Sequence, residues 1–171
     1  LDGVIFHPIH NGIDVDAYPR PSPKPDARPP WVGYWSSPDR GLARLLCAWP
    51  KVRRAIPDAR LRIYYSVRKY LQAAQCSTTM GPTLVMAEVV RELLAALGPR
   101  DGVDLVDVLP KRTLQRDQIR CRVMCYPTTT ISFTEGFGQA VGEAMAAGCL
   151  PIIRATDAFG DLWGDVSWVI R

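Results

Sequence analysis

The feature that most constrains the fold of this chain is an alternation of short apolar runs with segments of helical periodicity. Strand-like runs occur at 31–37, 60–66, 102–110, 121–127 and 149–154. Helical patterns lie between them, at 41–54, 83–97, 111–119 and 138–147. Strands that are joined by helices need crossover connections, which set neighbouring strands in parallel. The sequence therefore predicts an α/β fold: a single Rossmann-like domain with a parallel sheet covered by helices on both faces.

Two of the helices are predicted from apolar residues that recur on one helical face. The first face consists of Leu42, Leu45, Leu46, Trp49 and Val52. The second consists of Met86, Val90, Leu93, Leu94 and Leu97, with Gly98 as the expected stop. Both faces are expected to be core. The stretch 65–83 has no clear period and is left unassigned.

Residues 1–30 differ in composition from the rest of the chain. A short strand-like run, "GVIFHPIHNGID", is followed by "YPRPSPKPDARPP", which has six prolines in thirteen residues. Prolines at this density prevent regular strand pairing and favour an extended tether. We therefore divide the chain into an N-terminal segment with a Pro-rich linker (1–30) and a folded domain (31–171).

Composition excludes some classes of protein and favours others. A chain of 171 residues fits one domain, and no apolar run approaches the roughly 20 residues of a membrane span, so no transmembrane segment is expected. The net charge of +4 favours anionic ligands. It is not concentrated in the Lys/Arg stripe of a nucleic-acid binder, so no nucleic-acid partner is expected.

The cysteines favour reduced thiols over a disulfide framework, because five is an odd number and their spacing is not paired. Cys121 and Cys125 are four residues apart, but the only histidines, His7 and His10, lie near the N-terminus, so a zinc site is not expected. The chain begins at Leu1 with no recognisable leader, and an upstream segment is expected. Free thiols without a leader favour a cytoplasmic location.

The glycine-rich stretch "TEGFGQAVGEAMAAG" at 134–148 precedes a predicted helix, where backbone N–H groups often bind an anion. Its glycines Gly136, Gly138 and Gly142 approach the fingerprint of an NAD(P)-dependent oxidoreductase. That fingerprint directly follows a strand, whereas the strand here ends near Tyr126, ten residues before Gly136. The oxidoreductase is therefore the weaker alternative.

A structural interpretation of the same stretch also stays open. Here Gly136 and Gly138 bend a loop, Gly142 lets the helix pack on the sheet, and the glutamates at 135 and 143 are solvated surface residues.

The longer string "EGFGQAVGEAMAAGCLPI", at 135–152, has two glutamates separated by seven residues. It resembles the donor-binding signature of retaining glycosyltransferases with the GT-B fold, specifically glycosyltransferase family 4. "HNGID" (10–14) is similar to the segment between the two lobes, and 36–65 and 103–128 resemble units of the donor lobe. The resemblance implies the C-terminal half of a GT-B fold, with 31–171 binding a nucleotide-sugar and the N-terminal acceptor-binding domain missing.

By resemblance, the full protein would be a hexosyltransferase-like enzyme. It would move a sugar from a nucleotide-diphosphate donor to an unknown acceptor with retention of the anomeric configuration. The isolated domain is expected to be inactive or very slow, because the second lobe is needed to exclude water and place the acceptor. A non-catalytic nucleotide-sugar-binding module remains the alternative. Tyr34 stands where relatives often have a basic residue, and 66–69 lacks their usual glycine pair.

The resemblance also assigns roles to individual residues. Glu135 would face the transferred sugar and is the catalytic candidate, while Glu143 would accept hydrogen bonds from the ribose hydroxyls. Arg40 would bind the diphosphate. The sugar and phosphate oxygens would meet the loop formed by Gly136, Phe137, Gly138 and Gln139.

Other positions are assigned more loosely. Lys111 and Arg112 are expected near the base, with a solvated helix start as the alternative, and Arg68 or Lys69 could supply a second cation for the diphosphate. No metal and no cofactor are implied, since side chains and a helix end neutralise the leaving group in the family.

Overall fold

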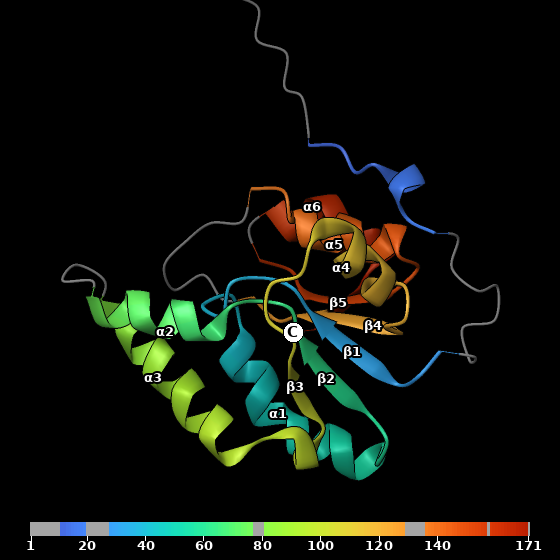
Figure 1. Ribbon diagram of the computed structural model, residues 1–171. Helices are drawn as coiled ribbons and strands as arrows, with labels where there is room; N and C mark the ends of the chain where they lie inside the picture. The colour runs from blue at the N-terminus through green and yellow to red at the C-terminus, as the bar shows by residue number, and fades with distance from the viewer. Residues whose placement is uncertain (1–10, 20–27, 77–80, 129–135, 157, 171) are drawn as a thin grey trace, which may run out of the picture.

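The computed structural model describes residues 11–19, 28–76, 81–128, 136–156 and 158–170. Six strands form one sheet in the order β3-β2-β1-β4-β5-β6, and every neighbouring pair is parallel (Figure 1). From β1 to β6 the strands are Trp31–Tyr34, Arg60–Ile63, Val103–Leu105, Val123–Tyr126, Leu150–Arg154 and Trp168–Ile170. The predicted Rossmann-like α/β fold is confirmed.

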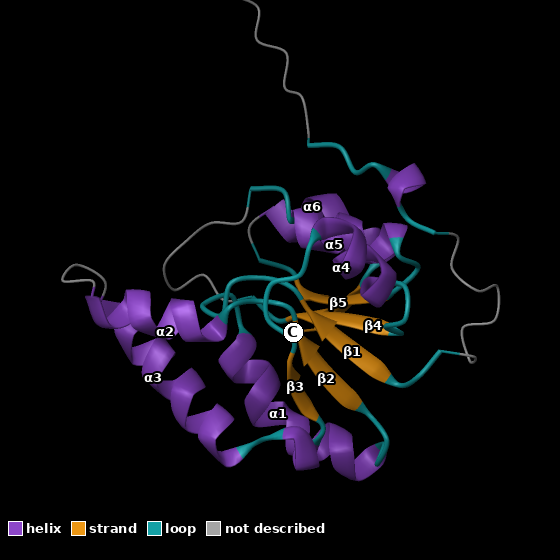
Figure 2. Cartoon of the chain, viewed as in Figure 1, coloured by secondary structure: helices purple, strands orange, loops and turns teal. Residues whose placement is uncertain are grey.

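Six α-helices cover the sheet in two layers. From α1 to α6 they are Leu42–Ala55, Val67–Cys76, Gly81–Ala96, Lys111–Gln118, Gln139–Ala146 and Ala158–Trp163. Figure 2 shows α1, α2 and α3 on one side of the strands and α4, α5 and α6 on the other. This is the doubly wound arrangement that crossover connections of a single hand produce when the chain moves outward from β1 and then from β4.

The predicted elements are found at their expected places, with shorter strands. The run predicted as a strand at 102–110 is β-structure only over Val103–Leu105. The unassigned stretch 65–83 contains α2 and the start of α3, and α6 and β6 follow the last predicted strand. The predicted strand at 3–14 is not formed in its described part, 11–14, which has no regular secondary structure.

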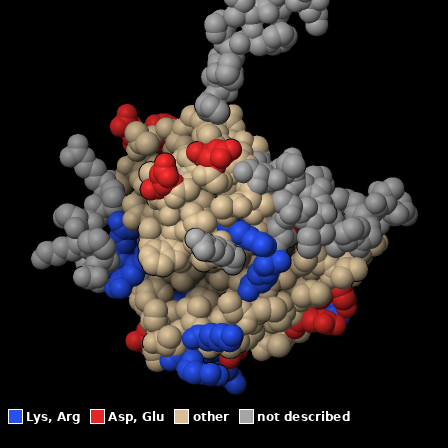
Figure 3. Space-filling view, turned by 180° about the vertical axis from the view of Figure 1, so that it is seen from behind, with Lys and Arg blue, Asp and Glu red and all other residues tan. Residues whose placement is uncertain are grey.

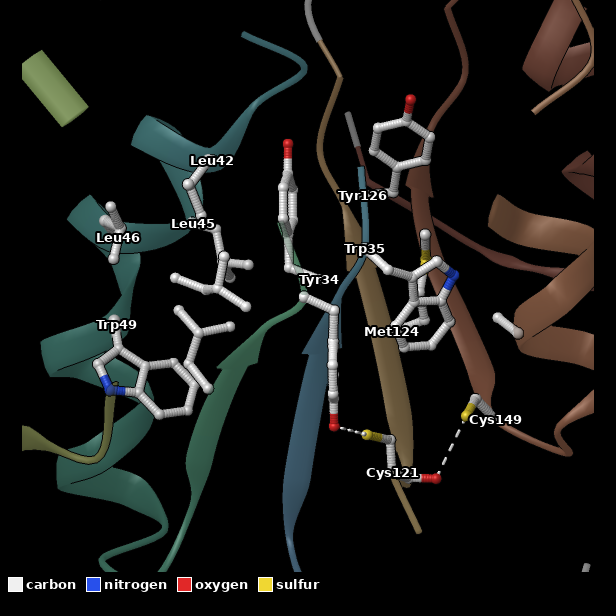
Figure 4. Packing of buried hydrophobic residues seen from close by; sticks show 14 of the residues in the cluster. Tyr34, Trp35, Leu42, Leu45, Leu46, Trp49, Cys121, Met124, Tyr126 and Cys149 are labelled. Atoms are coloured by element: carbon white, nitrogen blue, oxygen red, sulfur yellow. Dashed lines mark hydrogen bonds between the residues drawn. The ribbon is translucent and has the colours of Figure 1, made fainter. Parts of the chain in front are cut away.

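The predicted apolar face of α1 is core. Leu42, Leu46 and Trp49 are fully buried against the sheet, and Figure 4 shows them on one side of the strands with Met124 on the other. The indole N–H of Trp49 donates to the Asp101 carbonyl 2.8 Å away, so the buried ring keeps its polar atom satisfied. In α3, Val90 is fully buried and the other predicted residues pack against the core.

Described parts of the predicted linker also contact the domain. Tyr18 is buried in the same core cluster, and the Arg28 guanidinium donates to the carbonyls of Cys121, at 3.1 Å, and Gly148, at 2.8 Å. Arg28 thereby binds one carbonyl that follows α4 and one that follows α5, where a cation is favoured by the helix dipole.

All five cysteines are free thiols, as expected. Burial raises the pKa of Cys121 to about 11 and that of Cys125 to about 12.

None of the described helices has the length and apolar character needed to cross a lipid bilayer. On the face seen from behind, Lys and Arg lie in separate groups and form no continuous stripe (Figure 3).

Candidate functional site

The strand order reverses between β1 and β4, because the chain leaves β1 toward β2 and leaves β4 toward β5. Loops that diverge from such a point leave a crevice at the carboxyl ends of the strands, where open α/β sheets bind ligands. A cleft of about 260 Å³ lies there. It is lined by Trp35, Ser36, Arg40, Tyr126, Gly138, Gln139, Ala140 and Glu143.

Two glycines in the left-handed conformation allow the loops to meet at this cleft. Gly41 has φ 98° and is the N-cap of α1, and Gly138 has φ 76° and is the N-cap of α5. A Cβ on Gly41 would lie 2.2 Å from the Pro127 carbonyl oxygen, and one on Gly138 would lie 2.2 Å from the Phe159 ring. Both positions therefore require glycine, for its backbone conformation and for the close approach.

A glycine N-cap has no side chain to accept hydrogen bonds from the first turn of its helix. At α5 this turn begins at Gln139, which lines the cleft together with Gly138. The N-terminal end of α5 therefore brings backbone N–H groups and the positive end of a helix dipole to the cleft, where both favour an anion.

Arg40 contributes a cation to the same cleft. Its Nη1 donates to the hydroxyl oxygen of Tyr126 at 3.2 Å, and Ser36 Oγ donates to the same oxygen at 2.8 Å. Tyr126 is almost fully buried at the end of β4. The guanidinium is thus positioned by a rigid strand residue 86 positions away in the sequence.

Glu143 lies one turn inside α5 and is 9% exposed. Its Oε1 pairs with the Lys111 ammonium, and its Oε2 accepts from Gln118 Nε2 at 3.3 Å. The pKa of the nearby Tyr18 hydroxyl is raised, mainly by burial and further by the negative charge of Glu143. The interpretation of Glu143 as a solvated surface residue is therefore wrong. Glu135, the catalytic candidate, lies outside the described residues.

The rest of the glycine-rich loop contacts α6 and the N-terminal segment. The Phe137 carbonyl accepts from the Trp163 indole N–H at 2.6 Å, and the two rings meet edge-on. A Cβ on Gly136 would meet no atom within 4 Å. A Cβ on Gly142 would lie 2.7 Å from Ile13, so this glycine makes room for the N-terminal segment and not, as the structural interpretation proposed, for the sheet.

The loosely assigned basic residues lie in different places. Lys111 does not line the cleft, but it forms an ion pair with Glu143, which does. Arg112 lines another cavity, of about 480 Å³, between α4 and the N-terminal segment. Arg68 and Lys69 begin α2, outside the residues that line the cleft, and their charges contribute to lowering the pKa of Asp107, after hydrogen bonds from Val108 and Ser66.

Sequence reasoning did not single out four residues that shape the site. Trp35, Ser36 and Tyr126 line the cleft, and Gln118 orients Glu143. Trp35 and Ser36 are the first two residues after β1, and Tyr126 ends β4, so their positions at the reversal point could have indicated them. Tyr34 stands where a basic residue is common in the family that the sequence resembles, and it is fully buried. Its hydroxyl donates to the Ser37 carbonyl at 2.7 Å, which fixes the loop that carries Arg40.

No protein-family model and no curated protein matches the chain. Solved structures do match. AviGT4, a glycosyltransferase involved in avilamycin A biosynthesis, aligns with a TM-score of 0.63 and 15% identity over 95% of this chain and 43% of its own. HepE from Anabaena, solved with UDP and glucose, aligns at 0.61 and 18% identity over 90% and 39%.

A third match comes from the C-terminal domain of LpcC from Francisella tularensis, a glycosyl transferase group 1 family protein. It has a TM-score of 0.57 and 13% identity over 94% of this chain and 80% of its own. The chain has the fold of a GT-B glycosyltransferase C-terminal domain. It spans 34% of the matching trehalose-phosphate synthase from Burkholderia vietnamiensis. Identities this low establish the fold alone.

Proposed function

We propose that this chain is the donor-binding domain of a retaining glycosyltransferase related to family 4. The complete enzyme would transfer a hexosyl group from a nucleotide-diphosphate sugar to an acceptor held by a separate N-terminal domain. One observation carries the proposal: a guanidinium, a helix N-terminus and a buried carboxylate line a single cleft at the reversal point of the sheet.

The diphosphate would lie between Arg40 and the first turn of α5. A helix N-terminus contributes only about 0.3–2 kcal/mol toward an anion, so it needs the additional cation to stabilise a departing nucleoside diphosphate. A guanidinium has donors in a planar fork that match two phosphate oxygens. The hydrogen bond to Tyr126 orients this fork before the ligand arrives.

The ribose would bind to Glu143. An ionised carboxylate only accepts hydrogen bonds, which suits the two hydroxyls of a ribose and not a phosphate. Gln118 holds one carboxylate oxygen from the buried side, while Lys111, whose side chain is 58% exposed, occupies the other from the solvent side. We therefore expect Lys111 to give way to, or share the carboxylate with, the ribose.

Glu135 keeps its proposed role beside the transferred sugar, on the strength of the signature that it begins. Its test belongs to the complete enzyme. There, Glu135→Gln is expected to lower kcat with little change in donor affinity, and NMR of the product is expected to show the anomeric configuration of the donor. A product of inverted configuration would contradict the retaining mechanism.

A non-catalytic nucleotide-sugar-binding module is the second candidate, and the composition of the cleft favours it. Among the described residues that line the cleft, Arg40 supplies the one guanidinium and there is no lysine. Such a site can hold a diphosphate, but it neutralises the charge of a departing nucleoside diphosphate only weakly. The oxidoreductase alternative is disfavoured, because the glycine-rich loop follows β4, whereas a dinucleotide fingerprint follows the first strand.

Isothermal titration calorimetry on the 171-residue chain can test the site piece by piece. UDP, GDP and ADP are the first ligands, followed by the corresponding nucleoside and by pyrophosphate. Arg40→Ala is expected to weaken nucleoside diphosphate and pyrophosphate binding about 10- to 100-fold and to leave the nucleoside unchanged. Glu143→Ala is expected to weaken the nucleotide and the nucleoside and to leave pyrophosphate unchanged.

Arg91→Ala is the matched control, since this arginine is exposed on α3, where it pairs with Glu88. Arg112→Ala tests separately whether the base reaches α4, because Arg112 lines a different cavity and a selective loss of one nucleotide would place the base there. Unchanged nucleotide affinity in both Arg40→Ala and Glu143→Ala would remove the proposed site.

A further inference from the structure

One face of the β4–β5–β6 half of the sheet carries apolar side chains that the described helices cover only in part. Strand register places Cys125, Ile152 and Trp168 side by side on this face, with Ile170 following Trp168 by two residues. Trp168 is 64% exposed. On the opposite face, which α5 and α6 cover, Ile153 is fully buried. We name Cys125, Ile152, Trp168 and Ile170 the open apolar face.

Parallel sheets are normally covered on both faces, and contiguous exposed apolar surface marks a site of contact. The other half of this sheet also has a face that helices cover only in part, and it carries charged side chains there. There, the side that α1 does not cover presents Arg60, Arg62 and Asp104, which form ion pairs with one another. Compared with this charged face, the apolar composition of the face at β4–β6 indicates that it is buried against a partner.

A groove adjoins the open apolar face. Its volume is about 560 Å³, and it runs along the flank of α1, with Cys47 from α1, Met86 from α3 and Cys125 and Ile170 from the sheet among its lining residues. Three cations, Arg44, Lys51 and Arg154, line it as well, and its described lining contains no carboxylate. The groove therefore combines an apolar floor with positive charge only.

We propose that the open apolar face and this groove bind an amphipathic α-helix whose apolar stripe is flanked by acidic residues. A helix is the element that packs on a parallel sheet, and its diameter of about 10 Å suits a position beside α1. The acidic flanks follow from Arg44, Lys51 and Arg154. A second copy of the chain fits less well, because face-to-face packing would bring these cations of both copies together.

Two exposed thiols provide a test with an internal control. Cys47 lines the groove, whereas Cys76 is exposed at the end of α2 and does not. The probe is an 18-residue peptide helix with a leucine stripe flanked by glutamates, and its matched control has lysines in their place. The Cys76→Ser variant reports on Cys47 and the Cys47→Ser variant on Cys76, each through its rate of reaction with a maleimide.

The glutamate peptide is expected to slow modification of Cys47 about fivefold when four-fifths of the chain is bound, with no effect on Cys76. Added salt is expected to weaken this protection, and the double change Lys51→Glu, Arg154→Glu is expected to shift it to the lysine peptide. Equal protection by both peptides would overturn the proposal, as would no protection, or protection by a concentration-dependent dimer of the chain alone. Nucleotide affinity is expected to stay unchanged throughout, because the groove and the cleft share no lining residue, so this test is independent of the donor site.

Discussion

Each half of the sheet has one face that helices cover only in part, and the two faces differ in composition: one is charged and the other is apolar. On the β1–β2–β3 half, Asp104 accepts from Arg60 and also pairs with Arg62, which reaches Asp117 of α4 at 2.9 Å. The Arg62 guanidinium also lies 4.2 Å from the centre of the Trp31 ring. Arg60, Arg62 and Asp104 therefore each have an oppositely charged or aromatic neighbour, which compensates for their partial burial.

On the β4–β5–β6 half, the partly covered face lies on the opposite side of the sheet. It presents Ile152, Trp168 and Ile170, and its described residues form no such network. The comparison teaches that exposure alone does not identify a binding surface. The chemistry of the exposed residues distinguishes a face that is adapted to solvent from one that is adapted to a partner.

The largest expected difference concerns neighbouring residues on β5. Ile153→Ala removes a fully buried side chain beneath α6 and is expected to lower the free energy of unfolding by about 2–5 kcal/mol. Ile152→Ala, on the open apolar face, is expected to cost less than about 1 kcal/mol. Urea denaturation measures both. Equal losses would mean that the open apolar face is packed in solution and would break the comparison.

The face that carries Arg60, Arg62 and Asp104 should become less stable when Arg62 is removed. Arg62→Met leaves Asp104 and Asp117, both mostly buried, without this partner and is expected to cost about 1–3 kcal/mol. Arg91→Met is the matched control, because its ion pair with Glu88 is exposed, and it is expected to leave the free energy of unfolding nearly unchanged. If Arg62→Met left the free energy of unfolding unchanged, the network would not stabilise this face.

A pH series sharpens the same contrast. The hydrogen bond from Arg60 and the charges of Arg60 and Arg62 hold the pKa of Asp104 below its ordinary value of 3.8. A lowered folded-state pKa stabilises the fold fully above the unfolded value, and this stabilisation is lost as pH falls through the folded value.

Asp104→Asn is therefore expected to cost about 0.5–1 kcal/mol at pH 7, since Arg60 is partly exposed, and progressively less below about pH 4. Denaturation at pH 7, 5 and 3 measures the change. A difference between the variant and the parent that is the same at all three values would argue against the ion pair.

The smallest effect on stability is expected at the open apolar face itself. Trp168→Lys replaces an indole that is 64% exposed and should change the free energy of unfolding by less than about 0.5 kcal/mol. It should nonetheless abolish protection of Cys47 by the glutamate peptide, because it removes apolar contact area. A variant that is strongly destabilised would show that Trp168 is packed within the domain and would remove it from the docking surface.

Most of the fold could be predicted because its signals are local. The apolar period of α1 and the short runs that became β1, β2, β4 and β5 need only neighbouring residues to be recognised. The elements that were missed, α2, α6 and β6, are short or polar, and they are stabilised by packing against the rest of the domain.

The features of the site also divide into those with local signals and those that depend on packing. The sequence by itself determined the loop with Gly138, the carboxylate of Glu143 one turn into its helix, and a cation after the first strand, since these are features of contiguous segments. Only the tertiary structure decided that Arg40 meets Tyr126, that Lys111 pairs with Glu143, and that an apolar face of the sheet is left partly open. Such pairs depend on strand order and on which face each helix covers, and no local period in the chain encodes either.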